Sequence, residues 1–252
     1  MKKVFSSSLV AMAIGVFLFF LVSCSKKGPP LVVVTAGESA PFSMLNEDGN
    51  FIGFDVDLIK MIAKSMGREV EFKRLPFEKV LDAVRTKDGD IAIGGISITE
   101  DRANIVKFSP PIHSGSFVLL LLEGAAINGL EDLSGKMVGV RAGSLQEGVA
   151  KSTWEKNIRN IFVKSFPELT GKDIVSKLQS SELAAVVLDT DEGKYIASKN
   201  SGFKIIPLDA GSFEMGIVTP IGSACSDHIS KFVTENREEI ARLEVKWFSA
   251  KN

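Results

Sequence analysis

The sequence predicts an α/β protein of two lobes joined by a two-strand hinge. Short β-branched runs alternate with segments of helical period, a pattern typical of a parallel sheet covered by helices. This alternation occurs in both halves of the 252-residue chain. Extended segments at 116–122 and 214–219 follow the first and the second half, and they can carry the chain between two lobes. A single continuous sheet is the alternative that these patterns leave open.

The first half begins with a strand at 31–35, an apolar run suited to burial on both faces. A helix follows from Asp55 to Met66, because apolar residues recur on one face and Gly67 ends it. A strand at 69–75, a helix at 77–86 and a strand at 90–94 complete a β-α-β-α-β order, which implies a parallel sheet covered by helices.

The second half repeats this order. We expect strands at 136–140, 160–165, 183–188 and 203–207, and helices at 144–157, 170–180 and 192–199. A final helix is expected at 226–247. Open α/β sheets bind ligands beyond the carboxyl ends of their strands, so the sequence predicts a ligand cleft between the lobes.

Residues 1–23 have the composition of a secretory signal. Lys2 and Lys3 precede an apolar stretch at 9–22, whose 14 residues are too few for a membrane-spanning helix of about 20. The stretch ends in Ser23-Cys24 after Leu-Val, which resembles the lipobox of bacterial lipoproteins. We expect cleavage before Cys24, a lipid on its thiol and a tether over 24–30. An ordinary signal peptide or a single-pass anchor is the alternative.

Charge and residue usage exclude several classes of protein. The cleaved chain would hold 28 Lys and Arg, since Lys2 and Lys3 are lost, against 31 Asp and Glu. This balance near −3 gives no basic excess, so no nucleic-acid partner is expected. Cys225 is expected to be a small core residue. The two histidines stand far apart and no phosphate-binding glycine motif occurs, so we expect no metal and no cofactor.

Several short motifs occur in a characteristic order. The first half contains GFDVDL at 53–58, GISITEDR at 95–102 and FSP at 108–110, and the second contains DLSGK at 132–136, GVRAGS at 139–144, AAVVLD at 184–189 and KWF at 246–248. Together they resemble bacterial extracellular solute-binding protein family 3, the polar amino-acid-binding proteins of ABC importers. The resemblance implies the type II periplasmic-binding-protein fold, with lobe 1 at 31–118 plus 213–252 and lobe 2 at 119–212.

In this family the first lobe binds both charged groups of a free amino acid. Arg102 offers a planar, permanently charged fork that matches a carboxylate. Ser97 can add its hydroxyl and backbone N–H, while Gly94 and Gly95 allow close approach and their carbonyls can accept from the ligand ammonium. A salt bridge on a helix surface is the alternative role for Arg102.

The second lobe is expected to supply the opposite side of the site. Ser144 and Leu145 follow a strand where a helix begins, and backbone N–H groups at a helix N-terminus attract anions. They are therefore expected to bind the same ligand carboxylate as Arg102. Asp189 matches the family acid that pairs with the α-ammonium. Capping of the following helix is the alternative role for Asp189.

The side-chain subsite is less well defined by the sequence. Phe77 matches a position that often stacks on the ligand side chain. The family usually has an acid where Ala36 falls and an aromatic residue where Ser39 falls, so this chain departs at both positions. Glu38 can replace the acid and would suit a cationic head group, whereas Arg141, at a pocket-lining position, would favour a polar or acidic one.

The sequence therefore predicts a binding protein with no catalytic residues: the extracytoplasmic component of an ABC amino-acid importer that closes around its ligand. Arginine or lysine is slightly favoured, with a glutamine-like ligand next. The expected partners are a free amino acid, a membrane permease, and the membrane itself through the lipid on Cys24. We expect a monomer. The alternative is a periplasmic cyclohexadienyl dehydratase-like enzyme on the same fold, in which Glu38 would be the acid.

Overall fold

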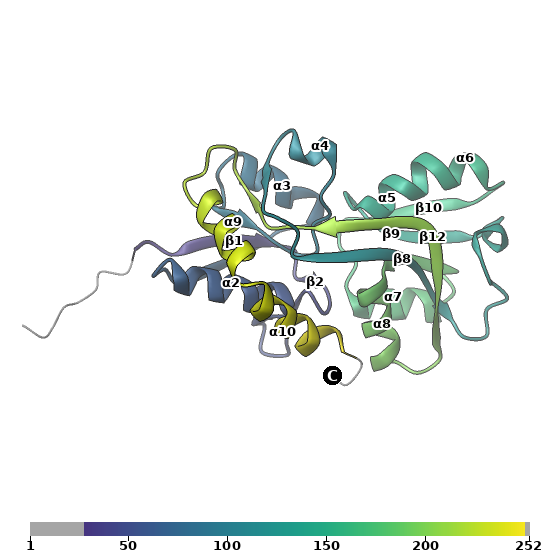
Figure 1. The fold of residues 1–252 in the computed structure, drawn as a ribbon. Helices are drawn as coiled ribbons and strands as arrows, with labels where there is room; N and C mark the ends of the chain where they lie inside the picture. Colours follow the sequence, from purple (N-terminus) through teal and green to yellow (C-terminus); the bar gives the residue numbers. More distant parts are fainter. Residues whose placement is uncertain (1–27, 250–252) are drawn as a thin grey trace, which may run out of the picture.

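Two five-stranded sheets, each with its own helices, form two lobes in the computed structural model, which describes residues 28–249. Figure 1 shows the lobes joined by the long strands β8 (His113–Leu122) and β12 (Phe203–Met215). These two strands pair antiparallel along their length, with an irregularity between Pro207 and Ser212. The predicted mixed α/β architecture is confirmed, and the single continuous sheet is excluded for the described residues.

The first sheet has the strand order β5-β1-β6-β13-β7. Its central strand β1 (Leu31–Thr35) pairs in parallel with β5 (Val70–Arg74) and β6 (Ile91–Ala92). β13 (Val218–Thr219) adds antiparallel to β6, and β7 (Lys107–Phe108) pairs with β13. Because β1 has neighbours on both sides and helices over both faces, its apolar side chains are almost wholly buried, as its composition predicts.

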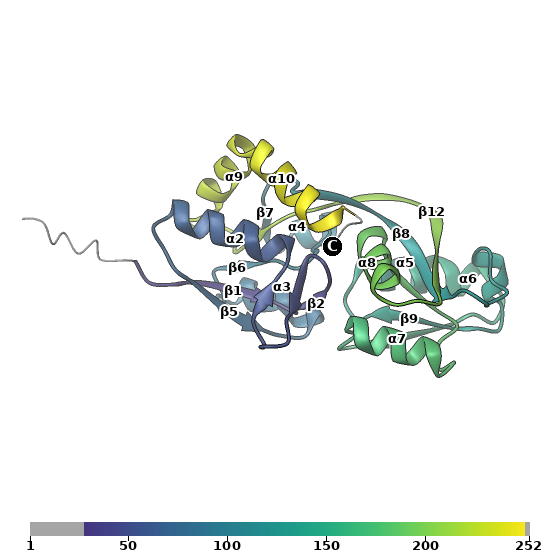
Figure 2. The same ribbon diagram turned by 90° about the horizontal axis from the view of Figure 1, so that it is seen from below.

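The helices of the first lobe are α2 (Phe54–Ser65), α3 (Phe77–Arg85), α4 (Glu100–Ala103), α9 (Ser226–Glu235) and α10 (Arg237–Phe248). Figure 2 shows α2, α9 and α10 grouped on one side of the first sheet. The prediction of one final helix at 226–247 is wrong. Asn236 leaves helical geometry, with φ −114° and ψ 33°, and its side chain donates to the carbonyl of Phe232. The chain therefore bends there, and α10 packs along α2.

The second sheet has the strand order β10-β9-β11-β8-β12. β9 (Met137–Arg141) pairs in parallel with β10 (Phe162–Phe166) and β11 (Ala185–Asp189), and β11 pairs antiparallel with β8. The sequence predicted a short strand at 203–207 and a separate crossing at 214–219. The structure instead has one strand, β12, that continues to Met215 before β13 begins.

The helical elements of the second lobe are η1 (Leu130–Leu133), α5 (Leu145–Val149), η2 (Ala150–Trp154), α6 (Glu155–Asn157), α7 (Gly171–Gln179) and α8 (Thr190–Lys199). The helix predicted at 144–157 is therefore three consecutive segments, of which η2 is a π-helix. The wider turn places Trp154 in the core beside the buried Ala150.

A small three-stranded sheet is an element that the sequence analysis missed. It consists of β2 (Glu38–Ser39), β3 (Ser43–Leu45) and β4 (Phe51–Ile52). The hydroxyls of Thr35 and Ser43 lie 3.0 Å apart and tie this sheet to the end of β1. Strands of two or three residues carry too little periodicity to be predicted, yet this sheet holds Glu38 against the second lobe.

The lipidated signal and the exact limits of the two lobes both stay predictions. Cys24 and the signal at 1–23 lie outside the described residues, and no helix within 28–249 is both long and apolar enough to cross a bilayer. At the start of the described chain, Arg68 donates to the carbonyls of Pro29 and Pro30, each at 2.8 Å. The predicted lobe limits at 118/119 and 212/213 fall inside β8 and β12 and stay a prediction.

Candidate ligand-binding site

Arg102 reaches from the first lobe to the second. Thr99 caps α4 by accepting the backbone N–H of Arg102 at 3.3 Å. The guanidinium donates through Nη1 to the carbonyl of Ser97 at 2.8 Å and through Nη2 to the carbonyl of Gly143 at 2.9 Å. Burial lowers the pKa of Arg102 to about 10, so the group keeps its charge at neutral pH. The lobes are therefore in contact through the predicted carboxylate-binding residue.

Phe77 and Ser97 lie beside Arg102, as the sequence analysis expected of a common site. The Cζ atom of Arg102 lies 6.0 Å from the centroid of the Phe77 ring, within the range of a cation–π contact. Ser97 is buried and forms an isolated bridge with Met215 at the end of β12. The hinge strand thus fixes the loop that carries Ser97.

The loop at Gly94 and Gly95 is held by a residue that sequence reasoning missed. Asp55, in the first turn of α2, accepts the N–H of Gly95 at 2.9 Å. The loop needs φ of 139° and 66° at its two glycines, which side chains would resist. Burial raises the pKa of the Asp55 carboxyl to about 7. The sequence does show Asp55 and Asp57 at the start of a helix, but acids at that place ordinarily stabilise the helix dipole, so nothing marked Asp55 as a partner of the glycine loop.

The second-lobe loop at 141–144 faces the first lobe at Gly143. Ser144 caps α5 by accepting the N–H of Glu147 at 3.1 Å, and its hydroxyl donates to the carbonyl of Arg141 at 2.6 Å. The Glu147 carboxylate also accepts the N–H of Gly143 at 2.7 Å. Leu145 is the first residue of α5 and is half-buried. One backbone N–H of the turn predicted to bind an anion, that of Gly143, is therefore already bonded to the carboxylate of Glu147.

Asp189 caps α8, which is the alternative role that the sequence left open. Its Oδ1 accepts the N–H groups of Asp191 at 2.9 Å and Glu192 at 3.0 Å. Burial, together with the charge of Glu192, raises the pKa of the Asp189 carboxyl to about 7. Both capping bonds use one oxygen, and a carboxylate has a second one to offer. Capping and ligand binding are therefore compatible at this position.

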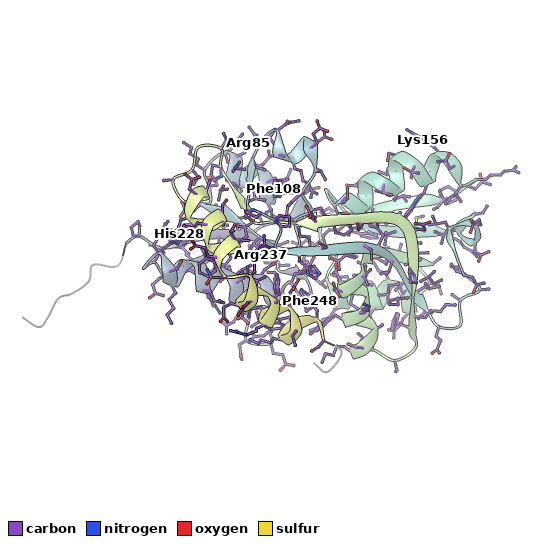
Figure 3. The ribbon with its side chains drawn as sticks, viewed as in Figure 1. Arg85, Phe108, Lys156, His228, Arg237 and Phe248 are labelled. Carbon is purple, nitrogen blue, oxygen red and sulfur yellow. The ribbon has the colours of Figure 1, made fainter. Side chains whose placement is uncertain are left out.

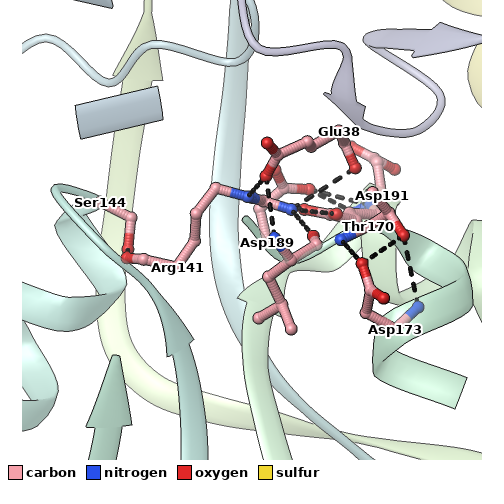
Figure 4. Close-up of polar contacts among 9 residues, drawn as sticks. Glu38, Arg141, Ser144, Thr170, Asp173, Asp189 and Asp191 are labelled. Carbon is pink, nitrogen blue, oxygen red and sulfur yellow. Dashed lines mark hydrogen bonds and ion pairs between the residues drawn. The ribbon is translucent and has the colours of Figure 1, made fainter. Parts of the chain in front are cut away.

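Arg141 lies at the centre of a buried ionic cluster (Figure 4). Its Nη2 lies 2.8 Å from Oε1 of Glu192 and donates to the carbonyl of Leu169 at 3.0 Å. Its Nε lies 3.4 Å from Oε2 of Glu38, an oxygen that also accepts the N–H of Leu169 at 3.0 Å. Glu38 comes from β2 of the first lobe, so this cluster is a second contact between the lobes.

Glu192 is a site residue that the sequence analysis did not single out. Only 2% of its surface is exposed, one helical turn after Asp189 in α8. Its acidic neighbours at the start of a helix gave no reason to separate it from ordinary helix-capping residues. The pairing with Arg141 depends on strands that are distant in sequence, so no local pattern could reveal it.

The cluster carries more negative than positive groups. The carboxyls of Glu38, Asp189 and Glu192 surround one guanidinium, that of Arg141, and all four residues are buried. Burial raises the pKa of Glu38, although the Leu169 N–H and Arg141 oppose the rise. Burial also lowers the pKa of Arg141, but Glu192 and Glu38 outweigh it, so the pKa lies above its ordinary value. A buried acid surplus of this kind attracts a proton or a cation.

The predicted site residues fall into two groups that share the loop at 141–144. Arg102, with Ser97 and Phe77 beside it, meets this loop at Gly143, and Asp189 and Glu38 meet it at Arg141. Ser39 is buried in β2 opposite Ser43, within the small sheet. Over residues 28–249 no group of three His, Cys, Asp or Glu side chains is placed to hold a metal ion.

Known proteins resemble the chain along almost its whole length. The family model of the bacterial extracellular solute-binding proteins, family 3, matches residues 31–250. The arginine-binding extracellular protein ArtP of Bacillus subtilis (strain 168) is 28% identical over 87% of this chain and 86% of its own length.

Solved structures resemble the fold in the same way. Two structures of ancestral arginine-binding proteins, one bound to glutamine and one to arginine, are each 32% identical. They cover 88% of this chain and 98% and 99% of their own, with TM-scores of 0.78 and 0.77. AncCDT-1, an ancestral amino-acid-binding protein and a precursor of cyclohexadienyl dehydratase, is 26% identical with a TM-score of 0.78, over 89% of this chain and 97% of its own. The chain belongs to the bacterial extracellular solute-binding proteins, family 3.

Proposed function

We propose that this protein is the extracytoplasmic substrate-binding component of an ABC amino-acid importer and that it binds a polar L-amino acid, with a cationic side chain favoured. The observation that carries the proposal is the pair of opposed charges. Arg102 meets the 141–144 loop at Gly143, and the acid-rich group of Asp189, Glu38 and Glu192 meets it at Arg141. A zwitterion has one obligatory charge for each side.

The two ends of the ligand backbone suit different partners. A ligand carboxylate can replace the carbonyl of Gly143 as an acceptor for Arg102, and a charged pair gains more than a neutral one. The α-ammonium suits the second oxygen of Asp189. Burial raises the pKa of Asp189 to about 7, and a bound ammonium would lower it again by favouring the charged form.

The side-chain preference follows from the remaining charges. Once Asp189 pairs with the ammonium, Glu38 and Glu192 still share only the guanidinium of Arg141. A guanidinium or ammonium head group would balance this surplus, which favours arginine or lysine. A neutral amide is the next choice, because its carbonyl oxygen could accept from Nε of Arg141 and because burial raises the pKa of Glu38. This Nε is buried with no hydrogen-bond partner among residues 28–249.

Closure is the proposed mechanism of capture. The contacts of Arg102 with Gly143 and of Glu38 with Leu169 and Arg141 join residues of opposite lobes, so they exist only when the lobes are together. A ligand that touches both lobes at once binds the closed form better than the open form, and this difference in affinity shifts the population. A permease that recognises the closed lobes would then accept the loaded protein.

A thermal-shift screen of the twenty amino acids against the soluble protein from Ser25 onward tests the proposal. We expect arginine and lysine to stabilise the protein most and glutamine next. Calorimetry on the variant Glu38→Gln then separates the two ligand types, because this change removes the acid but not the hydrogen-bonding groups. It should weaken arginine binding more than glutamine binding. Stabilisation by no amino acid would contradict the proposal, and stabilisation by aspartate or glutamate alone would contradict its side-chain part.

A dehydratase is the second candidate, favoured by one specific observation. Burial raises the pKa of Glu38, as a general acid requires. Its pairing with Arg141 at 3.4 Å opposes that role by favouring the charged carboxylate. Incubation with a cyclohexadienyl substrate, followed by the ultraviolet absorbance of the aromatic product, distinguishes the two. Turnover that Glu38→Gln abolishes would establish the enzyme, and we expect none.

A further inference from the structure

His113 lies where the two lobes meet and contacts a carboxylate in each direction. Its Nδ1 lies 2.7 Å from Oε1 of Glu244 in α10, and its Nε2 lies 2.9 Å from Oδ2 of Asp191 in α8. His113 is the first residue of β8, one of the two strands that join the lobes. A neutral imidazole carries one N–H, whereas the charged ring carries two. Two carboxylate partners therefore fit the charged ring.

The packing around the ring fixes its orientation. Phe42, Phe54 and Phe248 surround it, with ring centroids 5.4, 6.1 and 4.5 Å from that of His113. Only 11% of the side chain is exposed. Figure 3 labels Phe248 and Arg237 at the two ends of α10, the helix that carries Glu244. The aromatic rings and the two carboxylates therefore hold the imidazole in an arrangement in which both nitrogens are bonded.

The bond to Asp191 acts on the ligand-binding turn of the second lobe. Asp191 follows Asp189 by two residues, and its N–H is one of the two that Asp189 accepts. Glu192, which binds Arg141, is the next residue in the same turn. A cation that holds Asp191 against the hinge thus positions the start of α8, with both acids of the proposed ligand site.

We propose that His113 is a positioning residue for ligand capture: in its charged form it bridges Asp191 of α8 to Glu244 of α10 and holds the closed lobes together, and it releases α8 when it loses a proton. This inference rests on the proposed function, because it concerns closure around the same ligand. It adds a group outside the ligand site that makes capture depend on pH.

Four elements near the ring contribute charged groups. Asp191 and Lys194 lie on α8, Glu244 and Arg237 on α10, Asp55 on α2 and Asp189 at the end of β11. Arg237 and Glu244 line a cavity of about 320 Å³ that reaches His113, which gives protons a route to the ring. The acids outnumber the cations, and this surplus favours a charged imidazole.

The direction of the pH dependence follows from the partners. Burial lowers the pKa of His113, but the bonds to Asp191 and Glu244 outweigh it, so the pKa of the closed form lies above the ordinary value. Below the ordinary pKa the ring is charged in open and closed forms alike, and the bridge contributes fully. As pH rises through the raised pKa the bridge is lost. Loss of the bridge should therefore lower affinity as pH rises. The ionisation of Asp189, whose pKa is about 7, acts in the opposite direction, because only the charged carboxylate pairs with the ligand ammonium.

Calorimetry of the purified protein between about pH 6 and pH 8.5, with the amino acid identified by the thermal screen, tests this dependence. Because the ionisation of Asp189 affects parent and variant alike, we compare the two: the affinity of the parent relative to that of His113→Gln should fall roughly 5-fold to 50-fold over that range, the size of a typical coupling between sites. His113→Gln should bind more weakly at about pH 6 by a similar factor and should lose the alkaline fall. Glu244→Gln, at a side chain that is 36% exposed, should behave in the same way if His113→Gln does not fold.

His228→Gln is the matched control, because the chain has only two histidines. His228 lies on α9 away from the hinge (Figure 3), and its Nε2 is 2.8 Å from the Ser65 hydroxyl. This variant should keep the parental pH profile. An alkaline fall that survives His113→Gln and Glu244→Gln, or that disappears in His228→Gln, would overturn the proposal.

A ligand-free measurement separates this inference from the proposed function. Proton NMR titration of the two imidazoles, assigned with His228→Gln, should give His113 a pKa above its ordinary value. The fluorescence of Trp247, which lines a cavity with Asp191 between α10 and α8, should change over the same titration in a Trp154→Phe background. Failure of every amino acid to bind would overturn the proposed function alone. An ordinary pKa for His113 would overturn the bridge alone.

Discussion

Among single residues, Arg102 makes the most direct prediction. Its guanidinium is half-buried and, within residues 28–249, donates to the backbone carbonyls of Ser97 and Gly143, so a ligand carboxylate would be its first anionic partner. Arg102→Ala should weaken amino-acid binding by roughly 2–5 kcal/mol, because the carboxylate would be buried without its partner. Isothermal calorimetry measures the loss. Near-normal affinity for every amino acid that the parent binds would remove Arg102 from the site.

Glu192 makes a second prediction at the same scale, on stability. The carboxylate forms the shortest ion pair of the buried Arg141, at 2.8 Å. Glu192→Gln should lower the free energy of unfolding by roughly 1.5–3 kcal/mol, since a charged hydrogen bond to Arg141 becomes a weaker one to an amide oxygen. Urea unfolding at neutral pH gives the value. A matched change at the exposed pair of Lys231 and Glu235, Glu235→Gln, should cost at most about 1 kcal/mol.

At the scale of elements, the turn between β9 and α5 limits how closely the lobes can approach. Gly143 has φ of 74°, and a Cβ atom there would lie 2.9 Å from Cα of Glu78 in α3 of the other lobe. Gly143→Ala should therefore hinder closure and weaken ligand binding by about tenfold or more, through both the clash and the backbone strain. Calorimetry and the thermal shift with ligand would both report the loss.

Gly148 provides the control for this change in the neighbouring helix. It lies in α5 with nothing within 4 Å of an added Cβ, so Gly148→Ala meets open space. The substitution should leave binding unchanged and raise stability slightly, by about 0.5–1 kcal/mol, because alanine is the better helix residue. Equal losses of affinity in both variants would show that closure does not bring Gly143 against α3.

For the whole molecule, the buried acids predict how stability depends on pH. Burial raises the pKa of both Asp55 and Asp189 to about 7, far above the ordinary value near 3.9 of an unfolded chain. Between these values the folded protein holds protons that the unfolded chain has lost. The free energy of unfolding should therefore fall as pH rises, by up to about 1.4 kcal/mol per pH unit for each group.

Urea unfolding of the ligand-free protein at pH 5 and pH 8 measures this effect, and we expect greater stability at pH 5. The raised pKa of His113 changes the free energy of unfolding in the same direction, because the stability that its charged form contributes is also lost as pH rises. Asp189→Asn should reduce the slope by removing one of the titrating groups. A stability that rises from pH 5 to pH 8 would show that neither acid holds its proton in the fold.

The position of the molecule in the cell gives the last prediction. If Cys24 carries lipid, Cys24→Ser should release the protein from membranes and leave amino-acid binding intact, since a lipid chain contributes only to attachment. Fractionation of cells with an antibody against the protein shows where it goes, and calorimetry of the released form checks its binding. Membrane association that persists in Cys24→Ser would contradict the lipobox prediction.

The sequence alone determined the fold class, the order of most strands and helices, and the family motifs. Each of these is written locally, in hydrophobic period or in a run of a few residues such as 97–102. Arg102 and Ser97, which the motifs supplied, do lie together in the structure, and so does Phe77, which matches a single family position. The break at Asn236 and the small sheet at 38–52 escaped prediction, because one residue or a two-residue strand carries no period.

Only the tertiary structure decided which charges meet. Glu38 faces Arg141, Glu192 pairs with the same guanidinium, and His113 lies between Asp191 and Glu244, although these partners are separated by 51 to 131 residues in sequence. In sequence each acid is an ordinary polar residue of a strand or helix. The energy of an ion depends on its burial and on its neighbours in space, and both are set by how the two lobes pack against each other.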